Sequence, residues 1–378
     1  MLDAYTIINL QKRMLECMQY DVELLDSLIE EVRILSDNVK RIHERTSTSI
    51  SLVGTDGGNN KLQFDPFIVQ VIRVVDSSNN EYYMDVITPT TPIEILNKKI
   101  MDKSNEQCNA LRGMMRYLGI TDLTKLSPMI NYRKPEDPVK TSWVQVYREL
   151  VEWATLFSIV REKDFGTDTL IVFDGQLRSK VFSKGLFTKL KDGIQASIEE
   201  KYQKNKRKLY IVGVAKHSKV LERYKLAMHI ENVMTSGYPC YVEIPREMEE
   251  KAYIWSEYAK DDSFDRKEVN NMVAGKMFFV KFGNDKYDPI WPIDLLTFQA
   301  NDAQVILGCL LNDAVSGFPI PFYPLSLQKA HNNAALVDFD MDIVQHQILN
   351  SIRDVLGDKS PRLDSYLLIE QNPASARY

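Results

Sequence analysis

Apolar residues between Leu10 and Arg45 recur at alternating steps of three and four, which is typical of a helix that packs along one seam. The seam consists of Leu25, Leu28, Val32, Leu35, Val39 and Ile42, and charged residues surround it. A seam of this length could join two copies of the chain or bind a partner protein. It could equally pack against the chain's own core, and the pattern alone leaves both interpretations open.

Short apolar runs farther along the chain predict strands, and longer amphipathic stretches predict helices. The runs at 67–75 and 81–87 flank the turn-forming residues 76–80 and predict an antiparallel meander. Further strands are expected at 49–56, 170–174, 209–215 and 277–282, and helices at 92–120, 142–160, 183–205, 301–314 and 325–337. Residues 121–140 are expected to be an irregular connection. This alternation predicts an α/β fold with a mixed sheet flanked by helices.

The same pattern suggests a division of the chain into three parts. Residues 1–47 form an N-terminal helical, coiled-coil-like segment, and residues 48–340 form the main domain. An α+β insertion is expected within that domain at about 241–290, and residues 341–378 form a C-terminal helix and tail.

Composition limits the class of protein. The chain has 378 residues, of which 44% are hydrophobic and 26% charged, as is usual for a soluble globular protein. It contains no apolar run of membrane-spanning length and no basic-then-apolar signal at its beginning, so we expect a cytoplasmic protein without a membrane partner. The net charge of −5 does not indicate a nucleic-acid partner, although a local basic groove is compatible with it.

The cysteines argue against a soft-metal site. Cys17, Cys108, Cys240 and Cys309 are far apart, and none belongs to a Cys-x-x-Cys motif or lies at metal-ligand spacing from a histidine. Neither a zinc site nor a disulfide framework is therefore expected, and we predict four buried thiols.

Asp174 follows an apolar run, Leu170-Ile171-Val172-Phe173, and precedes Gly175. A second strand-like run ends in the same way, at Asp56-Gly57-Gly58. Asp-Gly after a strand can be a simple turn. Because functional groups collect at strand ends in α/β sheets, the two acids could instead hold a divalent metal ion between them.

The predicted order of elements matches a ribonuclease-H-like core, which brings carboxylates from separate elements to one edge of the sheet. Two divalent cations about 3.5–4 Å apart need several such oxygen ligands. An acid on the helix at 142–160, either Glu149 or Glu152, could join Asp56 and Asp174. Carboxylates suit Mn²⁺ or Mg²⁺.

Five motifs together resemble, in order, those of the NurA nuclease family. They are Asp56-Gly57-Gly58, the helix carrying Arg148, Glu149 and Glu152, Phe173-Asp174-Gly175-Gln176-Leu177, Gly213-Val214-Ala215-Lys216, and Tyr323-Pro324-Leu325 followed by Ala330-His331. The ordered set covers residues 50–335 and is more specific than any single motif. The resemblance implies a ribonuclease-H-like fold and a Mn²⁺-dependent (or Mg²⁺-dependent) DNA nuclease with 5′-to-3′ exonuclease activity, and possible single-strand endonuclease activity. It also implies a nucleoid-associated homodimer that acts with a HerA-type hexameric DNA translocase in DNA end processing, repair or defence.

The resemblance also implies roles for individual residues. Asp56 and Asp174 match the metal-binding aspartates, and Glu152 matches the glutamate because it completes the pattern Arg148-x-x-x-Glu152; Glu149 is the alternative. His331 matches a further metal ligand or proton carrier. Tyr323 would hydrogen-bond to the DNA end or stack on it. Lys216 would hold the scissile phosphate or offset charge on the attacking water.

Basic residues after the central strand offer a candidate DNA path. They are Lys180, Lys184, Lys189, Lys191, Lys201, Lys204, Lys206, Arg207 and Lys208. A solvated helix face explains such a run equally well.

Two other functions fit parts of the pattern. Actin-like phosphotransferases also repeat strand-Asp-Gly units around nucleotide phosphates, but Gln176-Leu177-Arg178 lacks the small residues that such loops use. A catalytically silent helicase adaptor could keep the fold and bind its partner through the N-terminal helix. ATP binding would favour the first alternative, and partner support retained by Asp174→Asn would favour the second.

Overall fold

The computed structural model describes residues 3–45, 50–64, 67–133, 136–137, 139–254, 271–336 and 338–357. Contacts divide the chain into two compact units. The first unit comprises Met1–Thr55 and Val160–Gln328, and the second comprises Asp56–Ile159 and Lys329–Tyr378. Both units are therefore built from segments that are far apart in the sequence.

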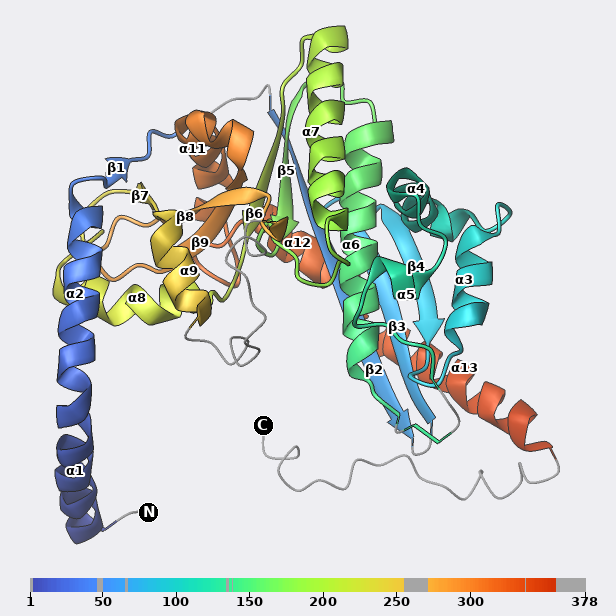
Figure 1. Cartoon of the computed structure of the whole chain (residues 1–378), viewed down its shortest axis with the longest axis horizontal. Coiled ribbons are helices and arrows are strands. Elements are labelled where there is room, and N and C mark those ends of the chain that lie inside the picture. The colour runs from blue at the N-terminus through green and yellow to red at the C-terminus, as the bar shows by residue number, and fades with distance from the viewer. Residues whose placement is uncertain are drawn as a thin grey trace. The chain divides into compact units, whose positions relative to one another are not determined.

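A mixed sheet forms the centre of the first unit (Figure 1). Its strands lie in the order β1-β7-β8-β9-β6-β5-β2. Strands β2, β5 and β6 are parallel, and the other pairs are antiparallel. The bounds are β1 Lys40–Arg41, β2 Ile50–Phe64, β5 Asp168–Asp174, β6 Leu209–Val214, β7 Cys240–Glu243, β8 Gly275–Lys281 and β9 Ile290–Leu296. Every residue of β6 is buried, as expected for a strand with neighbours on both sides and helices on both faces.

Helices cover both faces of this sheet. Successive strand residues point to opposite sides, so apolar residues on both faces need partners. On one face, Phe278 and Val280 of β8 pack in a cluster with α11 (Ala303–Val315). On the other face, Met277 and Phe279 pack with α2 (Val22–Ser36), α8 (Lys219–Ile230) and α9 (Arg246–Ile254). A further helix, α7 (Leu186–Asn205), connects β5 to β6 and buries Leu190 and Ile194.

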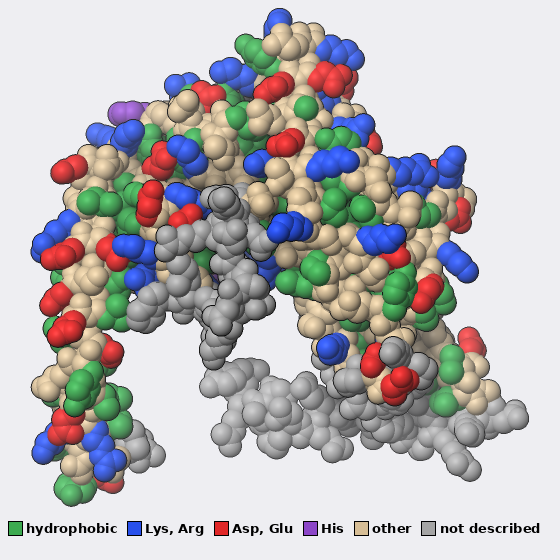
Figure 2. Space-filling view, in the orientation of Figure 1, with side chains coloured by type: hydrophobic (Ala, Val, Ile, Leu, Met, Phe, Trp, Pro, Cys, Tyr) green, Lys and Arg blue, Asp and Glu red, His purple; other side chains and the backbone are tan. Residues whose placement is uncertain are grey.

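The N-terminal seam packs within the chain. Val32 and Leu35 of α2 are buried against α8, and Ile42 belongs to the cluster around α11. The first helix, α1 (Ala4–Met18), is separated from α2 by the 3-10 turn Gln19–Asp21, and apolar side chains lie on its surface among charged ones (Figure 2). Among the residues described, no helix is both long enough and apolar enough to span a bilayer.

The second unit combines a meander with helices. Strands β3 (Phe67–Asp76) and β4 (Glu81–Ile87) pair antiparallel, which confirms the predicted meander. The helices are α3 Ile93–Met101, α4 Asn109–Leu118, α5 Leu123–Leu126, α6 Ser142–Glu162, α12 Leu325–Ala334, whose first turn belongs to the first unit, and α13 Asp338–Leu356. The single helix expected at 92–120 is two helices, because Asp102 caps the backbone and side chain of Ser104 and turns the chain between them.

The predicted fold class, an α/β mixed sheet flanked by helices with an N-terminal helical segment, is confirmed. The expected strand end at Asp56 is wrong, because β2 continues through Asp56-Gly57-Gly58 to Phe64. Turn preference is a weak local signal that pairing within a sheet overrides. The segment 241–290, expected as an insertion, contributes β8 and the beginning of β9 to the main sheet.

The cysteine prediction is partly wrong. Cys17 is exposed on α1, whereas Cys108, Cys240 and Cys309 are buried. The polar helix that carries Cys17 has no core to enter within the described residues, so its thiol is in solvent.

Candidate active site at the end of β5

Asp174 lies at the end of a buried strand. Leu170, Ile171 and Val172 of β5 have no exposed surface, and Asp174 pairs in parallel register with Val214 of β6. The backbone N–H of Gly175 donates to the carbonyl of Val214 at 2.9 Å, so the pairing continues one residue past the acid. The Asp174 carboxylate is thereby fixed at the sheet edge, with 15% of its side chain exposed.

Two donors hold the Asp174 carboxylate, one on each oxygen. The hydroxyl of Tyr323 donates to Oδ1 at 3.0 Å, and Nζ of Lys216 lies 3.2 Å from Oδ2. The Lys216 ammonium also lies 5.6 Å from the centre of the Tyr323 ring, which is within cation–π range. One-third of the Lys216 side chain is exposed, more than the 15% of Asp174, so Lys216 is the more accessible of the two charged residues.

Tyr323 differs from its predicted role. Its ring is 1% exposed and packs against Trp291 at 4.9 Å between ring centres. A buried ring has no free face for a DNA base, so the expected stacking on a DNA end is wrong. The hydroxyl instead orients Asp174, and the ring belongs to the cluster around α11.

The backbone register relates Asp56 to Asp174. Thr55 of β2 is the register partner of Phe173, and each of these residues immediately precedes one of the two aspartates. The side chain of Asp56 lies outside the described part of the structure. Its metal-binding role therefore stays a prediction.

Three other predicted site residues belong to the second unit. Glu152 on α6 is 13% exposed and lies 3.4 Å from Nε of Arg148, the i,i+4 pair that the motif predicted. Glu149, the alternative, is half-buried on the same helix. His331 is exposed near the end of α12. The first unit thus contains Asp174, Lys216 and Tyr323, which contact one another. The second unit contains Glu152 and His331.

The donor chemistry at Asp174 fits a hard divalent cation. A partly exposed carboxylate is the ligand type that Mn²⁺ and Mg²⁺ take in proteins. Within the described side chains, which exclude Asp56, no group of three His, Cys, Asp or Glu residues is arranged to hold a metal ion. A complete set of metal ligands therefore needs more residues than the described side chains bring together around Asp174.

The basic residues of the candidate DNA path differ in their surroundings. Lys180 and Lys184 are exposed immediately after β5, as a backbone-binding role requires. Lys201 instead donates to the carbonyl of Lys163 at 2.8 Å, and Arg207 donates to that of Phe165 at 2.6 Å. These two cations tie the end of α7 to the loop before β5.

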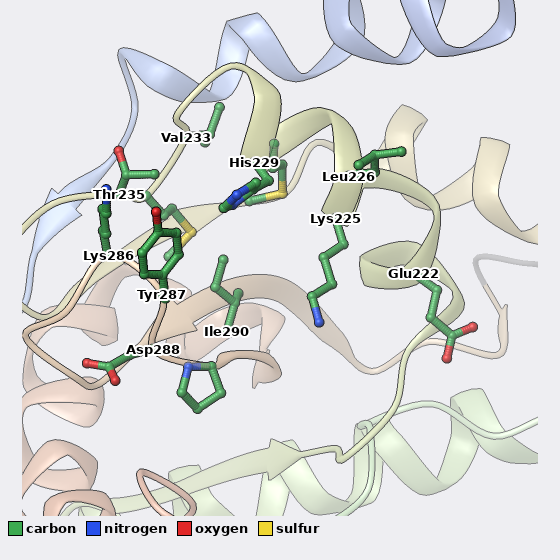
Figure 3. Close-up of a pocket in the computed structure, with 13 residues that line it drawn as sticks. Glu222, Lys225, Leu226, His229, Val233, Thr235, Lys286, Tyr287, Asp288 and Ile290 are labelled. Atoms are coloured by element: carbon green, nitrogen blue, oxygen red, sulfur yellow. The ribbon is translucent and has the colours of Figure 1, made fainter. Parts of the chain in front are cut away.

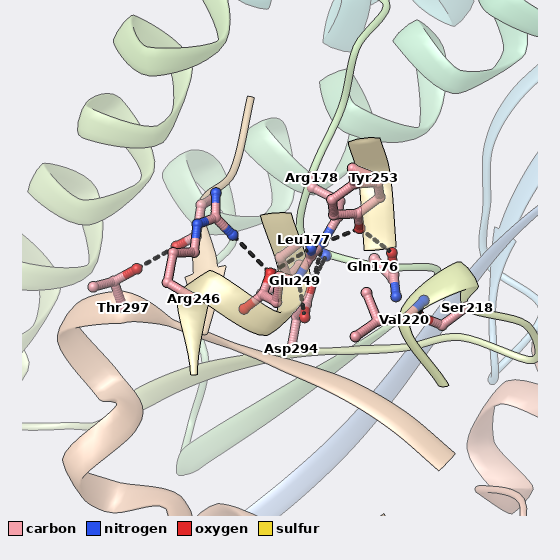
Figure 4. A network of polar contacts seen from close by, with 11 residues as sticks. Gln176, Leu177, Arg178, Ser218, Val220, Arg246, Glu249, Tyr253, Asp294 and Thr297 are labelled. Carbon is pink, nitrogen blue, oxygen red and sulfur yellow. Dashed lines mark hydrogen bonds and ion pairs between the residues drawn. The ribbon is translucent and has the colours of Figure 1, made fainter. Parts of the chain in front are cut away.

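A buried charged network next to Asp174 was not predicted (Figure 4). It consists of Arg178, Asp294, Glu249, Arg246 and Tyr253. The sequence did contain a signal, because Asp294 interrupts the apolar run of β9 and has no exposed surface. An acid at the centre of a buried strand needs a charged or hydrogen-bonded partner.

Two cavities lie away from Asp174. One of about 550 Å³ in the first unit is lined by α8, including His229, by Tyr287 in the loop before β9 and by Ile290, the first residue of β9 (Figure 3). A second, also about 550 Å³, lies in the second unit beside Trp143. Neither contains Asp174, so the charged side chains rather than cavity size identify the candidate site.

No protein-family model matches this sequence, and no curated protein matches it. Several solved structures are similar to it. The NurA nuclease from Sulfolobus solfataricus is 12% identical, with 92% of this chain and 98% of that chain covered and a TM-score of 0.46. NurA bound to dAMP and manganese is 10% identical, with 89% and 94% covered and a TM-score of 0.40. NurA with manganese is 10% identical, with 90% and 98% covered and a TM-score of 0.39. At these identities the similarity concerns the fold alone.

Proposed function

We propose that this protein is a metal-dependent DNA nuclease whose site is built around Asp174. The observation that carries the proposal is the cluster at the end of β5, where a partly exposed carboxylate is held by the hydroxyl of Tyr323 and the ammonium of Lys216. The sequence places both partners in motifs that resemble those of the NurA family. A fixed carboxylate beside a partly exposed cation suits a substrate that carries a phosphodiester.

The proposed metal ligands are Asp56, Asp174 and Glu152, with Glu149 as the alternative and His331 as a further ligand or proton carrier. Manganese is the first metal to test, and magnesium the second. When bound, such an ion would act as a Lewis acid that activates water and stabilises the leaving oxygen.

The chain's own residues have separable tasks at this site. The Tyr323 hydroxyl holds Asp174 in one orientation, because its ring is fixed in the core. Lys216 has an exposed side and can bind a phosphate oxygen while it remains near the carboxylate. Lys180 and Lys184 would contact the DNA backbone through charge, which gives affinity without sequence preference.

The finer parts of the proposal come from the family resemblance. They are 5′-to-3′ polarity, possible single-strand endonuclease activity, a homodimer, and action with a HerA-type hexameric translocase in DNA end processing, repair or defence.

Digestion of linear DNA labelled at the 5′ or 3′ end tests the function directly. The full-length chain is assayed with Mn²⁺, Mg²⁺ or EDTA, alone and with its translocase. Asp174→Asn keeps the shape of the side chain and removes its charge, so we expect cleavage to fall by about a hundredfold or more.

Asp164→Asn is the matched control, because the Asp164 side chain is 78% exposed in the loop before β5. This variant should cleave DNA as the unchanged chain does. Cleavage that resists EDTA, or equal cleavage by the two variants, would contradict the proposal. Absence of cleavage together with support of the translocase by Asp174→Asn would instead favour the adaptor.

A further inference from the structure

The chain turns sharply after Asp174 and folds over the neighbouring strand. Gly175 has φ of 126°, a conformation that side chains with a Cβ rarely adopt. The turn then lies on Gly213 of β6, where a Cβ would be 2.5 Å from the carbonyl oxygen of Gly175 and 3.0 Å from the nitrogen of Leu177. Because Gly213 has no Cβ, the turn can occupy the space directly above it.

Asp294 reaches this turn from the other side of Gly213. It is the register partner of Gly213 across the β6–β9 pair and has no exposed surface. Its Oδ2 accepts from the backbone N–H of Leu177 at 2.9 Å and from Nε of Arg178 at 2.9 Å, and its Oδ1 accepts from Arg178 at 2.6 Å. One carboxylate thus binds both the backbone and the side chain of the turn.

The remaining network keeps the charge on Arg178. The guanidinium also donates to Glu249 at 2.7 Å and to the Tyr253 hydroxyl at 2.7 Å, while Arg246 pairs with Glu249 at 2.7 Å (Figure 4). Burial alone would lower the pKa of Arg178, but Asp294, Tyr253 and Glu249 outweigh it and raise that pKa well above its usual value. The two guanidinium groups balance the two carboxylates, so Asp294 faces a permanent cation.

The backbone beyond the turn is held as well. The carbonyl of Leu177 accepts from the N–H of Ala274 at 2.8 Å, and the N–H of Ser179 donates to the carbonyl of Met272 at 2.9 Å. Gly175 to Ser179 is therefore fixed by β6 below it, by the start of β8 along its edge and by Asp294. Only the last of these contacts is made by an ionised side chain.

We propose that Asp294 is a positioning residue for the site at Asp174. It does not touch that acid. By binding the Leu177 N–H and Arg178, it fixes the turn that begins at Gly175, and so fixes the direction in which the Asp174 carboxylate leaves β5. The catalytic consequence rests on the proposed nuclease function, whereas the effect on the turn does not.

Glu249 provides the matched comparison. Both carboxylates are buried and both bind the same guanidinium, with 2% of the Glu249 side chain and none of the Asp294 side chain exposed. Only Asp294 binds the backbone of the turn. A role limited to stability predicts similar effects of the two substitutions, and a positioning role predicts different ones.

The experiment compares Asp294→Asn and Glu249→Gln in the full-length chain. The amide at 294 has one acceptor oxygen and no charge, and its N–H₂ group would face the donors of Arg178 where Oδ1 accepted. The contact with Arg178 is therefore disrupted and the acceptor for the Leu177 N–H is weakened. Hydrogen exchange is measured on peptides covering 174–178. Mn²⁺ binding is measured by titration, from the electron paramagnetic resonance signal of the Mn²⁺ that remains free. We expect exchange at Leu177 to accelerate about tenfold in Asp294→Asn.

Mn²⁺ binding by Asp294→Asn should weaken about tenfold, the lower end of what loss of a supporting contact costs a metal site. In Glu249→Gln both quantities should change less than about twofold. If Asp294→Asn does not fold, Asp294→Glu replaces it, because the longer side chain keeps the charge but displaces the carboxylate from the Leu177 N–H.

The outcomes separate the two proposals. Unchanged exchange at Leu177, or equal effects of the two substitutions, overturns the positioning role. Faster exchange with unchanged Mn²⁺ binding and cleavage also overturns it, and leaves the nuclease intact. If the unchanged chain neither binds Mn²⁺ nor cleaves DNA, the nuclease proposal fails, while faster exchange in Asp294→Asn still shows that Asp294 holds the turn.

Discussion

Two buried polar networks, one around Arg178 in the first unit and one around Tyr83 in the second, differ in charge. In the first unit Arg178 lies between the carboxylates of Asp294 and Glu249. In the second unit the hydroxyls of Tyr83 and Tyr147 lie 2.7 Å apart, and the Tyr83 hydroxyl donates to Asp85 at 3.1 Å. The first network joins two guanidinium groups and two carboxylates with one phenol, whereas the second joins two phenols to one carboxylate that also pairs with Lys99.

The difference shows what each network is suited to do. The phenols connect β4 to α6, two regular elements, and their rings meet edge to face at 6.4 Å between centres. The ionic network holds a turn that follows the candidate catalytic acid and whose backbone pairs only briefly, with residues 272–274. Charged hydrogen bonds are strong and directional, and so they fix an irregular backbone more firmly than phenol hydroxyls can.

The largest effect should come from removing the shared cation. Arg178→Met leaves Asp294 buried without its partner, and we expect it to destabilise the first unit by about 3–5 kcal/mol in urea unfolding. The double variant Arg178→Met, Asp294→Leu removes both charges and should recover much of that loss. A loss below about 1 kcal/mol for the single variant would show that Asp294 does not depend on Arg178.

A smaller effect is expected where the turn contacts β6. A Cβ added by Gly213→Ala would lie 2.5 Å from the carbonyl oxygen of Gly175, so the turn must shift. We expect a loss of about 1–3 kcal/mol, measured by urea unfolding, together with reduced cleavage.

Gly166→Ala is the control for that substitution, because a Cβ there has no described atom within 4 Å. Its stability should match that of the unchanged chain. A Gly213→Ala variant that is equally stable would mean that the turn can move away from β6 at no cost.

The contribution of the second network to the free energy of unfolding should depend on pH in the alkaline range. Burial raises the pKa of Tyr83 and of Tyr147 far above the usual value of 10. The folded chain therefore keeps both phenols protonated, whereas the unfolded chain ionises them above pH 10. Their contribution is fully present below pH 10 and is lost as pH rises toward the folded-state pKa, by about 1–3 kcal/mol at pH 11.

Urea midpoints measured between pH 8 and 11 check this direction. Tyr147→Phe should flatten the alkaline decline, because one of the two ionisable groups is removed. A decline that is equally steep in this variant would assign the effect to other groups.

The smallest effect is expected from the phenol contact at neutral pH. Tyr147→Phe keeps the buried ring and removes one hydroxyl, while Tyr83 keeps its bond to Asp85. Urea unfolding should show a loss of about 1 kcal/mol. Tyr20→Phe, at a side chain that is 88% exposed, should show no change. A loss as large as that of Arg178→Met would remove the contrast between the two networks.

The sequence by itself determined the strands and helices that repeat a clear apolar period. The buried run before Asp174 and the meander at 67–87 were predicted from their apolar residues, and the α2 helix from its three-and-four spacing. The packing of the α2 seam against the chain's own core was one of two interpretations that the sequence left open. The ordered motifs also singled out Asp174, Lys216 and Tyr323, which the first unit brings into contact. Local sequence suffices for these features because each depends on spacing along the chain.

Tertiary structure decided the rest. Asp56-Gly57-Gly58 has the composition of a turn, yet β2 runs through it, because the strand's neighbours supply the hydrogen bonds that local preference does not. Tyr323 was expected to contact a DNA end, but its ring is buried because α11 and Trp291 cover it. The partners Arg178 and Asp294 are 116 positions apart in the chain, and no period relates them. They meet only because β9 pairs with β6 opposite Gly213, and long-range pairing of this kind is fixed by the assembled sheet.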